Sequence, residues 1–402
     1  MMRLGFLISH PIQYYTPIFR ELAKACDLTV YFAHRQTGEG QANAGFGVAF
    51  EWDVDLLAGY RSRFLTNVAR EPSTDRFAGC DTPGIRQEIA DGRFDAFVVP
   101  GWGLRSYLQA VGACRRARVP IMVRGDSQLP GQRNAAVRLA KALAYPRMMR
   151  RFDGYLYVGK RSREYFEHYG ARPSRLFFAP HCVDNDAFGS VRRTDRSSCQ
   201  RARLLFAGKL IERKHPLDLI RAAMLLQGRG VGVEVAFAGS GELDDGLRRA
   251  AEQAGLPVVF HGFVNQSALP ATYAAADLLV LPSDGRETWG LVVNEAMACG
   301  LPAVVSDAVG CGPDLIEEGI TGAVFPLGDV ARLADAIART LALDPVASSD
   351  AVRARIALYS PYRTAQGIVG AAATLRRMMD GQIHGLRTDE AAHDRADGGM
   401  PG

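Results

Sequence analysis

Short apolar segments alternate with helix-like segments along most of this chain of 402 residues. In the first half the predicted strands are Leu4–Ser9, Leu28–Phe32, Ala96–Pro100, Ile121–Arg124 and Tyr155–Val158, and Arg175–His181 leads toward a linker. In the second half they are Leu204–Ala207, Glu234–Ala238, Val258–His261, Leu278–Leu281, Ala303–Ser306 and Ala323–Phe325. Apolar strands separated by helices indicate parallel sheets covered on both faces. The pattern therefore predicts an α/β chain with two doubly wound domains, and such sheets bind ligands beyond the carboxyl ends of their strands.

A polar stretch, Val191–Gln200, separates the two halves and has the composition of a linker. We place the first domain at 1–198 and the second at 199–358. A final helix is predicted over 359–379. Residues 380–402 lack apolar periodicity, which predicts a disordered tail.

Composition restricts the function classes. With 48% hydrophobic residues, each domain can bury its own core. The seven cysteines are odd in number and form no Cys-x-x-Cys pair, which favours free thiols in a reducing compartment over a zinc site. The apolar run at the N-terminus is shorter than the ~7–15 residues of a signal peptide, and Asp277 interrupts the most apolar candidate for a membrane span. We therefore expect a cytoplasmic protein.

The formal net charge of +5 is modest, which argues against a nucleic-acid partner. Basic residues nevertheless gather in the segment from Arg133 to Arg163, where Asp153 is the single acidic residue. They are Arg133, Arg138, Lys141, Arg147, Arg150, Arg151, Lys160, Arg161 and Arg163, and apolar residues lie between them. The pattern predicts a basic amphipathic surface for peripheral contact with an anionic membrane, although a solvated helix face would have the same pattern.

Two glutamates, Glu287 and Glu295, flank Gly290 with seven residues between them. The first lies on a predicted loop and the second on the helix that follows. The free N–H groups and the dipole of a helix N-terminus attract a diphosphate. Nearby carboxylates accept hydrogen bonds from vicinal hydroxyls, which a ribose and a hexose both offer. This arrangement suits a sugar nucleotide.

The segment, with Gly300-Leu-Pro and the turn from Gly310 to Pro313, resembles the glutamate pair of the family-4 retaining glycosyltransferases, which have the GT-B fold. Similar motifs follow in family order: Phe206-Ala-Gly208-Lys209-Leu210 with Lys214, Gly239-Ser-Gly241-Glu242, Phe260-His-Gly262-Phe263 and Ala275–Ser283. In the first half, the His-Pro-Ile-Gln-Tyr-Tyr motif from His10 to Tyr15, Trp52–Tyr60 and Arg124–Ser127 resemble a bacterial branch. The resemblance implies two Rossmann-like domains that face each other across a cleft. The first would bind the acceptor, the second the nucleotide sugar, and the last helix would cross back to the first domain.

The resemblance also implies a donor site. Lys209 and Lys214 would clamp the diphosphate, although the family usually has arginine at the first position and lysine lacks its planar fork. Glu295 would bind the ribose hydroxyls and Glu287 the hydroxyls of the donor sugar. The other implied donor-binding residues are Gly208, Gly239, Gly241, Phe263, Trp289, Gly290 and Leu291.

On the acceptor side, His10 and Gln13 follow the first strand and are expected to face the cleft. Asp126 stands where many family members have a histidine near the transferred sugar. We take Asp126, His10 and Glu287 as catalytic candidates. His10 could equally cap a strand and Asp126 a helix.

Two Asp-x-Asp pairs, Asp53/Asp55 and Asp184/Asp186, lie outside the expected nucleotide-binding segments. Turn or cap roles suit both pairs, so we expect transfer without a metal and no cofactor beyond the sugar nucleotide. The expected reaction is retaining transfer of a hexose from a nucleoside-diphosphate sugar to a bacterial envelope glycan or its lipid-linked precursor. The alternatives are a nucleotide-sugar 2-epimerase and a non-catalytic donor-binding subunit. A nicotinamide-dependent oxidoreductase is disfavoured because Asp244 stands where the dinucleotide fingerprint needs its third glycine.

Overall fold

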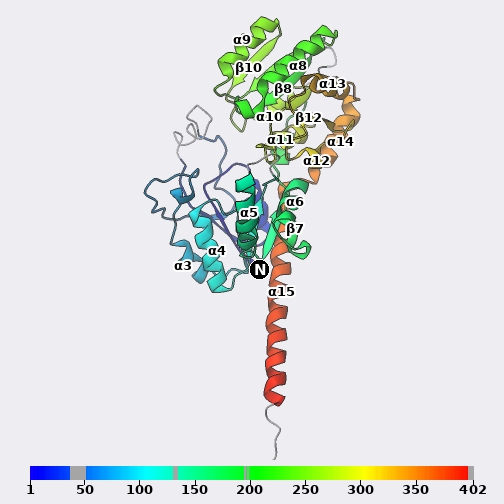
Figure 1. Cartoon of the computed structure of the whole chain (residues 1–402). Coiled ribbons are helices and arrows are strands. Elements are labelled where there is room, and N and C mark those ends of the chain that lie inside the picture. The colour runs from blue at the N-terminus through cyan, green and yellow to red at the C-terminus, as the bar shows by residue number, and fades with distance from the viewer. Residues whose placement is uncertain (37–50, 130–134, 194–195, 197–198, 397–402) are drawn as a thin grey trace, which may run out of the picture.

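The computed structural model describes residues 1–36, 51–129, 135–193, 196 and 199–396. Within them the strands form two sheets, one in each half of the chain (Figure 1). The seven-stranded sheet has the order β3-β2-β1-β4-β5-β6-β7, and the six-stranded sheet has the order β10-β9-β8-β11-β12-β13. Neighbouring strands pair in parallel in both sheets, as between β1 and β2 and between β8 and β9. The two doubly wound domains predicted from the strand pattern are confirmed.

The first sheet contains β1 (Arg3–Ile8), β2 (Asp27–Phe32), β3 (Arg61–Phe64), β4 (Ala96–Val99), β5 (Ile121–Gly125), β6 (Gly154–Tyr157) and β7 (Leu176–Phe178). Its domain also contains the helices α1 (Thr16–Ala25), α3 (Ile85–Gly92), α4 (Arg105–Ala117), α5 (Ala135–Met149) and α6 (Lys160–His168). The short helix α7 (Asn185–Gly189) follows, and its Phe188 lies in the core of the second domain. The strand β3 was not predicted, because it is polar and only half-buried. It lies at the edge of the sheet, where a strand is less buried and does not need to be apolar along its whole length.

The second sheet contains β8 (Ala202–Ala207), β9 (Val233–Ala238), β10 (Val258–Gly262), β11 (Leu278–Leu281), β12 (Ala303–Ser306) and β13 (Gly322–Phe325). The helices of this domain are α8 (Pro216–Gly228), α9 (Asp244–Ala254), α10 (Leu269–Ala274), α11 (Leu291–Ala298), α12 (Gly312–Leu315), α13 (Val330–Leu341) and α14 (Pro345–Ala357). Neighbouring strand residues enter separate cores: Leu279 packs on one face of the sheet and Val280 on the other. Both faces are therefore covered, as the unbroken apolar strands predicted.

The last helix, α15 (Pro361–Ala396), returns to the first domain, as the resemblance implied (Figure 1). Ile368 and Leu375 are fully buried in the same core as Phe6 of β1. The helix lies so close to β7 that a Cβ atom on Gly367 would lie 2.0 Å from the Phe178 carbonyl oxygen.

The helix α15 is longer than the sequence predicted. We expected it to end at residue 379 and a disordered tail to follow, but the backbone stays helical to Ala396. Absence of apolar periodicity shows that a segment lacks a buried face, not that it lacks a helix. Alanine, arginine and glutamate can extend a helix that packing has already nucleated upstream. Residues 397–402 of the predicted tail lie outside the described residues.

Polar contacts hold the two domains together across the cleft. The Lys160 backbone N–H donates to Asp314 Oδ2 at 2.9 Å, and Arg161 Nη1 donates to the Ala308 carbonyl at 3.0 Å. The Asp53 carboxylate accepts hydrogen bonds from the hydroxyl and the backbone N–H of Ser267. Lys160 and Arg161 belong to the basic segment predicted for a membrane, and the structure directs both toward the second domain instead.

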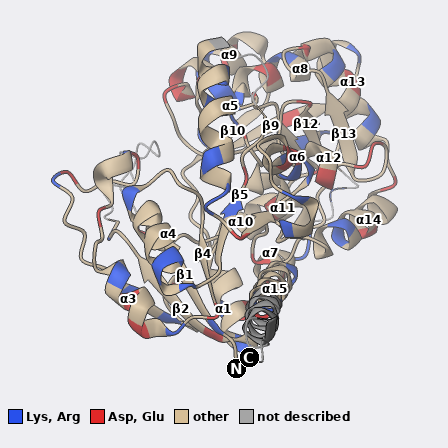
Figure 2. Cartoon of the chain, turned by 60° about the horizontal axis from the view of Figure 1, so that its bottom comes forward, with Lys and Arg blue, Asp and Glu red and all other residues tan. Residues whose placement is uncertain are grey.

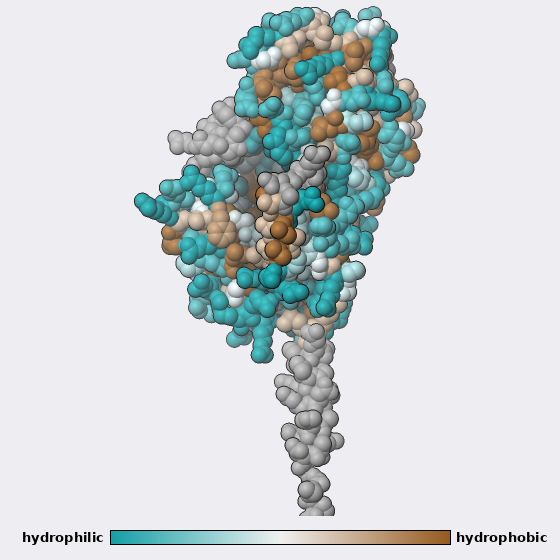
Figure 3. Space-filling view, in the orientation of Figure 1, coloured by the Kyte–Doolittle hydropathy of each residue, from teal (hydrophilic) through white to brown (hydrophobic). Residues whose placement is uncertain are grey.

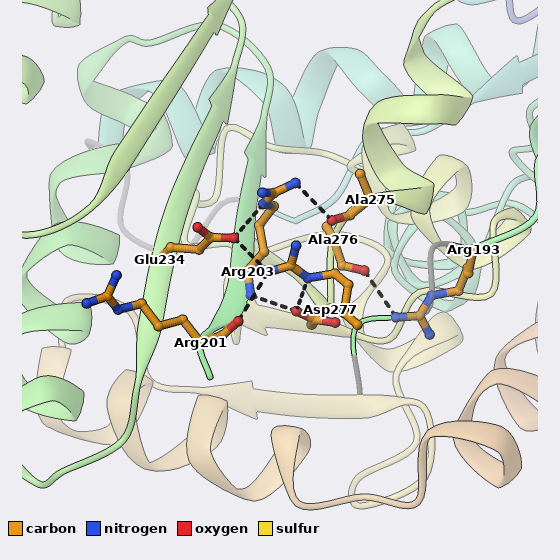
Figure 4. Close-up of polar contacts among 8 residues, drawn as sticks. Arg193, Arg201, Arg203, Glu234, Ala275, Ala276 and Asp277 are labelled. Atoms are coloured by element: carbon orange, nitrogen blue, oxygen red, sulfur yellow. Dashed lines mark hydrogen bonds and ion pairs between the residues drawn. The ribbon is translucent and has the colours of Figure 1, made fainter. Parts of the chain in front are cut away.

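An ion-pair network fixes the end of the linker to the second domain (Figure 4). Arg196 donates through Nε to Asp277 Oδ2 at 3.0 Å and through Nη2 to Glu234 Oε1 at 2.7 Å. The backbone N–H of Arg203 donates to the same Asp277 oxygen at 2.7 Å. Arg193 donates to the Ala276 carbonyl at 3.1 Å. Arg193 and Arg196 are therefore attached to the second domain.

We expect Asp277→Asn to lower the free energy of unfolding of the second domain by about 2–3 kcal/mol. In the variant, the mostly buried Arg196 guanidinium would lose its ion pair with residue 277 and keep only the one with Glu234. Urea denaturation measures the change. The matched control is Asp335→Asn, whose partner Arg229 is nearly half exposed, so its loss should cost less than about 1 kcal/mol. Equal losses for the two variants would contradict a structural role for the network.

The seven cysteines are all free thiols, and six of them are buried, which agrees with the prediction. Among the helices that the structure describes, none is long and apolar enough to cross a membrane.

Candidate functional site

Two glycine-rich loops lie side by side at the carboxyl ends of β8 and β9. Hydrogen bonds join them, from Gly208 N to the Ala238 carbonyl at 2.8 Å and from Leu210 N to the Ser240 carbonyl at 2.9 Å. Glycine is required by this approach: a Cβ atom on Gly239 would lie 2.0 Å from the Gly208 carbonyl oxygen, and one on Gly241 would lie 2.4 Å from the Leu210 carbonyl oxygen. The structure thus brings the three predicted glycines together as the floor of one site.

A cluster of positive side chains follows the first of these loops. Lys214 ends the short 3₁₀ helix η4 (Glu212–Lys214) and is 8% exposed. Burial and the charges of Arg213 and Lys214 together lower the pKa of Lys209. An anion bound at this loop would favour the charged form of Lys209.

Glu287 lies opposite this cluster, on the loop between β11 and α11. Its Oε2 atom forms an ion pair with Lys214 Nζ at 2.7 Å, and both side chains are largely buried. The backbone carbonyl of Glu287 accepts a hydrogen bond from Gly310 N at 3.0 Å. A Cβ atom on Gly310 would lie 1.7 Å from the Thr288 carbonyl oxygen, so the Gly310 turn packs directly under the glutamate loop. Lys214 and Glu287, two predicted donor-binding residues from distant motifs, are therefore in direct contact.

Gly290 forms the N-cap of α11 in the left-handed region, with φ at 100°. The turn brings the N-terminus of α11 to the same edge of the sheet as the glycine loops, and Leu291 is its first residue. Trp289, directly before the turn, does not offer its ring to a donor. Its indole is buried, donates to Asn294 Oδ1 at 2.8 Å and packs against His181 and Tyr359. The prediction that Trp289 binds the donor therefore concerns its backbone N–H group and not its ring.

Glu295, on α11, is 1% exposed. Its Oε2 atom accepts a hydrogen bond from the Tyr273 hydroxyl at 2.6 Å, and the Tyr14 hydroxyl of the first domain faces the same carboxyl group. Burial raises the pKa of Glu295 to about 7, although both tyrosines and Lys214 act in the opposite direction. The carboxyl group therefore titrates near neutral pH.

This raised pKa predicts how stability depends on pH. The folded state favours the protonated form of Glu295, so its contribution is complete below the usual pKa of 4.5 and is lost as the pH rises through 7. Relative to Glu295→Gln, which does not titrate, the wild type should lose about 2 kcal/mol of unfolding free energy between pH 5.5 and pH 8.5. Urea denaturation at the two pH values measures this loss. Equal pH dependence of the two proteins would contradict the raised pKa.

Asp126 follows β5 and reaches the glutamate loop of the other domain. Its Oδ2 atom accepts a hydrogen bond from the Thr288 hydroxyl at 2.9 Å and lies 3.7 Å from His181 Nε2. Burial raises the pKa of Asp126, but hydrogen bonds from His181 and Thr288 outweigh it and lower the pKa to about 2. Asp126 is thus an ionised carboxylate at the domain boundary rather than a helix cap.

His10 follows β1, and its Nδ1 atom lies 3.0 Å from the Ser9 hydroxyl. Burial and the neighbouring His34 lower the pKa of His10 to about 4, so the imidazole is neutral at pH 7. Asp75 acts in the opposite direction on the pKa values of both His10 and Lys209.

Three residues of the site were not predicted from the sequence: Tyr14, Tyr273 and His181. Tyr14 directly follows Gln13, which was expected to face the cleft, so its position in the sequence could have indicated a place in the site. Tyr273 and His181 lie outside every motif that carries chemistry, and only the fold brings them to Glu295 and Asp126. Phe263 directly follows β10, at the same edge of the sheet as the glycine loops.

The Asp-x-Asp pairs have separate roles. Asp55 caps a turn by accepting from Leu57 N at 2.9 Å, and Asp184 caps α7 by accepting from Ala187 N at 3.1 Å. Both roles were predicted. Asp53 instead bridges to Ser267 of the second domain. Among the described residues, no group of three or more His, Cys, Asp or Glu side chains could hold a metal ion.

Residues 192–355 match the family model described as "Glycosyl transferases group 1". This stretch contains the glycine loops, both lysines and both glutamates. The D-inositol 3-phosphate glycosyltransferases of Mycobacterium tuberculosis (strain H37Rv) and Mycobacterium bovis (strain AF2122/97) are each 36% identical over 193 residues, which cover 45% of this chain and 39% of each relative. The chain therefore spans about two fifths of the length of the curated relatives that it matches.

Solved structures cover nearly the whole chain. HepE from Anabaena in complex with UDP has a TM-score of 0.68 and 18% identity, and the match covers 93% of this chain and 100% of HepE. The lipopolysaccharide outer core galactosyltransferase WaaB has a TM-score of 0.65 and 14% identity, with 92% and 99% covered. Sucrose-phosphate synthase from Thermosynechococcus elongatus has a TM-score of 0.64 and 18% identity, with 98% and 100% covered. With its two facing α/β domains and returning helix, the chain has the GT-B fold.

Proposed function

We propose that this GT-B chain is a retaining glycosyltransferase that moves a hexose from a uridine diphosphate sugar to an acceptor hydroxyl. The observation that carries the proposal is the positive cluster of Lys209 and Lys214 opposite two buried glutamates, beyond the carboxyl ends of β8 and β9. The match of this stretch to the group 1 glycosyltransferase model supports it. HepE, which shares the fold, was solved with UDP and with UDP-glucose, and this favours a uridine donor.

In this proposal the diphosphate lies between the two lysines and the N-terminus of α11. Glu287 accepts hydrogen bonds from the donor-sugar hydroxyls and Glu295 from the ribose hydroxyls. Negative charge grows on the diphosphate as the glycosidic bond breaks. Cations that are already fixed in place stabilise that charge with little reorganisation, and they do so most strongly when water is excluded.

We propose front-face transfer. The acceptor oxygen bonds to the anomeric carbon on the face from which the diphosphate leaves, so the configuration is retained. The bond from that carbon to the phosphate oxygen breaks, and the departing phosphate oxygen takes the acceptor proton. The protein then acts by positioning the two substrates and by electrostatics. Asp126, ionised, and His10, neutral, are proposed to contact the acceptor.

The proposed acceptor is a bacterial envelope glycan or its lipid-linked precursor, reached at the membrane surface. The helix α5 exposes Val137, Leu139 and Leu143. No acidic residue occurs on this helix, and its basic residues are Arg138, Lys141 and Arg147 (Figure 2). Figure 3 shows hydrophobic and strongly hydrophilic residues side by side on this part of the surface. The apolar and basic residues of α5 are mixed rather than divided between two faces, so the proposed membrane contact rests on its positive charge. Arg133, part of the predicted basic segment, lies outside the described residues.

We expect Arg138→Glu/Arg147→Glu to reduce binding to vesicles containing phosphatidylglycerol at least tenfold, because each basic residue near the surface contributes about 1 kcal/mol. Co-sedimentation at two salt concentrations measures the effect. Arg249→Glu/Arg332→Glu is the matched control, since it makes the same charge change on exposed residues of the second domain. Equal binding of both double variants would contradict a lipid role for α5.

The proposed activity is tested by incubating the protein with UDP-hexoses, with and without a lipid-linked or oligosaccharide acceptor, and following UDP release. Acceptor-dependent release supports a transferase. Release of an altered hexose or hexose nucleotide without an acceptor would instead support an epimerase. Proton NMR of the product distinguishes retention from inversion at the anomeric carbon. Activity that is lost with a chelator and restored by manganese or magnesium would overturn the expectation of metal-independent transfer.

A further inference from the structure

The carboxyl group of Glu295 is closed off from solvent in this arrangement of the domains. It is 1% exposed, and its Oε2 atom already accepts from the Tyr273 hydroxyl at 2.6 Å. Its Oε1 atom is buried and has no hydrogen-bond partner among the described residues. A buried acceptor without a hydrogen-bond partner destabilises the folded state. The Oε1 atom could accept a hydrogen bond from a ribose hydroxyl. No ribose can reach it, however, unless a covering group moves.

Two tyrosines cover this carboxyl group, and they belong to different domains. Tyr273 lies on α10 of the second domain, is fully buried, and packs its ring against Phe188 at 6.0 Å between centroids. It is fixed within the core of its own domain. Tyr14 lies in the first domain, between β1 and α1. Its ring packs against the same core of the second domain, and its hydroxyl faces Glu295 and interacts with the Gln13 side chain.

Tyr14 is therefore the covering group that moves with the opposite domain. Separation of the domains would carry Tyr14 away from Glu295 and leave Tyr273 in place. Other contacts across the cleft are polar, such as the exposed one between Asp53 and Ser267. Interfaces of this kind commonly permit domain motion.

We propose that Tyr14 occupies the ribose position at Glu295 in the closed, nucleotide-free form, and that a nucleotide must displace it to bind. The inference rests on the proposed donor site. The ribose hydroxyls and the Tyr14 hydroxyl then compete for one carboxyl group, so the free protein is held closed by a contact that the donor replaces. The apparent affinity for nucleotide is reduced by the fraction of molecules in which Tyr14 is engaged.

The test compares Tyr14→Phe with Tyr15→Phe by calorimetry with UDP-glucose. Tyr15 is the matched control because it is the next residue and its hydroxyl contacts Arg124 at 3.2 Å instead of Glu295. Tyr14→Phe lacks the competing hydroxyl and should bind UDP-glucose about three- to tenfold more tightly than the wild type, the equivalent of one hydrogen bond. Tyr15→Phe should bind it as the wild type does. The gain should be smaller for the analogue with 2′-deoxyribose, which offers Glu295 one hydroxyl fewer.

A second readout needs no nucleotide. Small-angle X-ray scattering of Tyr14→Ala should give a larger radius of gyration than the wild type, since a contact that holds the free domains together is lost. Unchanged or weaker UDP-glucose binding by Tyr14→Phe, with normal binding by the wild type, would overturn this inference and leave the donor site intact. Absence of binding by the wild type and both variants would instead overturn the donor site and this inference together.

Discussion

Lys214→Met should lower the rate of glycosyl transfer by about 100- to 1,000-fold, the usual cost of removing one preorganised group that stabilises developing charge. Lys214 is nearly buried and pairs with Glu287 at 2.7 Å, so its position is fixed before the substrate arrives. Methionine keeps the length and apolar character of the side chain and removes its charge. The kinetic constants kcat and KM, measured with saturating acceptor, report the effect, and we expect most of the loss in kcat.

The variant could also act through stability, because Glu287 would lose its buried partner. The double variant Lys214→Met/Glu287→Gln removes both charges, so it separates the two effects: it should regain the wild-type Tm and remain inactive. Lys24→Met is the control for charge alone, since Lys24 is exposed and pairs with Glu21 on α1. Wild-type kcat in Lys214→Met would contradict the proposed phosphate clamp.

Glu295→Ala should weaken binding of a uridine diphosphate sugar about 100-fold, because two hydrogen bonds from ribose hydroxyls to a charged acceptor would be lost. The loss should be larger above pH 7 than below it, since burial raises the pKa of this group to about 7 and only the ionised form can accept both hydroxyls. The sugar nucleotide is a suitable ligand because its diphosphate is esterified at both ends and does not titrate in this range. Calorimetry at pH 6 and pH 8 measures both effects.

Glu252→Ala provides the matched control for Glu295→Ala, because Glu252 is exposed on α9 of the same domain. It should bind as the wild type does at both pH values. A wild-type affinity for Glu295→Ala would contradict the assignment of the ribose to Glu295. It would not by itself exclude the diphosphate clamp, which the Lys214 variants test separately.

The fold was largely predictable from the sequence because parallel strands buried on both faces are apolar along their whole length. β11 (Leu278–Leu281) and β12 (Ala303–Ser306) were predicted with the bounds that the structure gives them. The edge strand β3 was missed because an edge strand needs no such run. The extension of α15 to Ala396 was missed because helix propensity alone leaves no periodic apolar pattern in the sequence.

The donor side of the site was predictable where backbone geometry restricts the residue. Gly239 and Gly241 stand where no Cβ atom fits. Lys214 and Glu287 form an ion pair although 72 residues lie between them in the sequence. The contacts between domains were not predictable. Tyr14 meets Glu295, and Asp126 meets Thr288, only because the cleft closes. The sequence left open whether the Trp289 ring packs in the core or contacts the donor, and the structure buries the indole against Asn294.

Lys209, Lys214, Glu287 and Glu295 are proposed to form a donor site for a sugar nucleotide. Saturation-transfer NMR of the purified protein against uridine, guanosine and adenosine diphosphate sugars tests it most directly. We expect saturation transfer to a uridine diphosphate sugar, strongest at the ribose and the hexose, and its loss in Lys214→Met and Glu295→Ala. Absence of transfer to every nucleotide sugar in the panel, or equal transfer in the wild type and both variants, would contradict it.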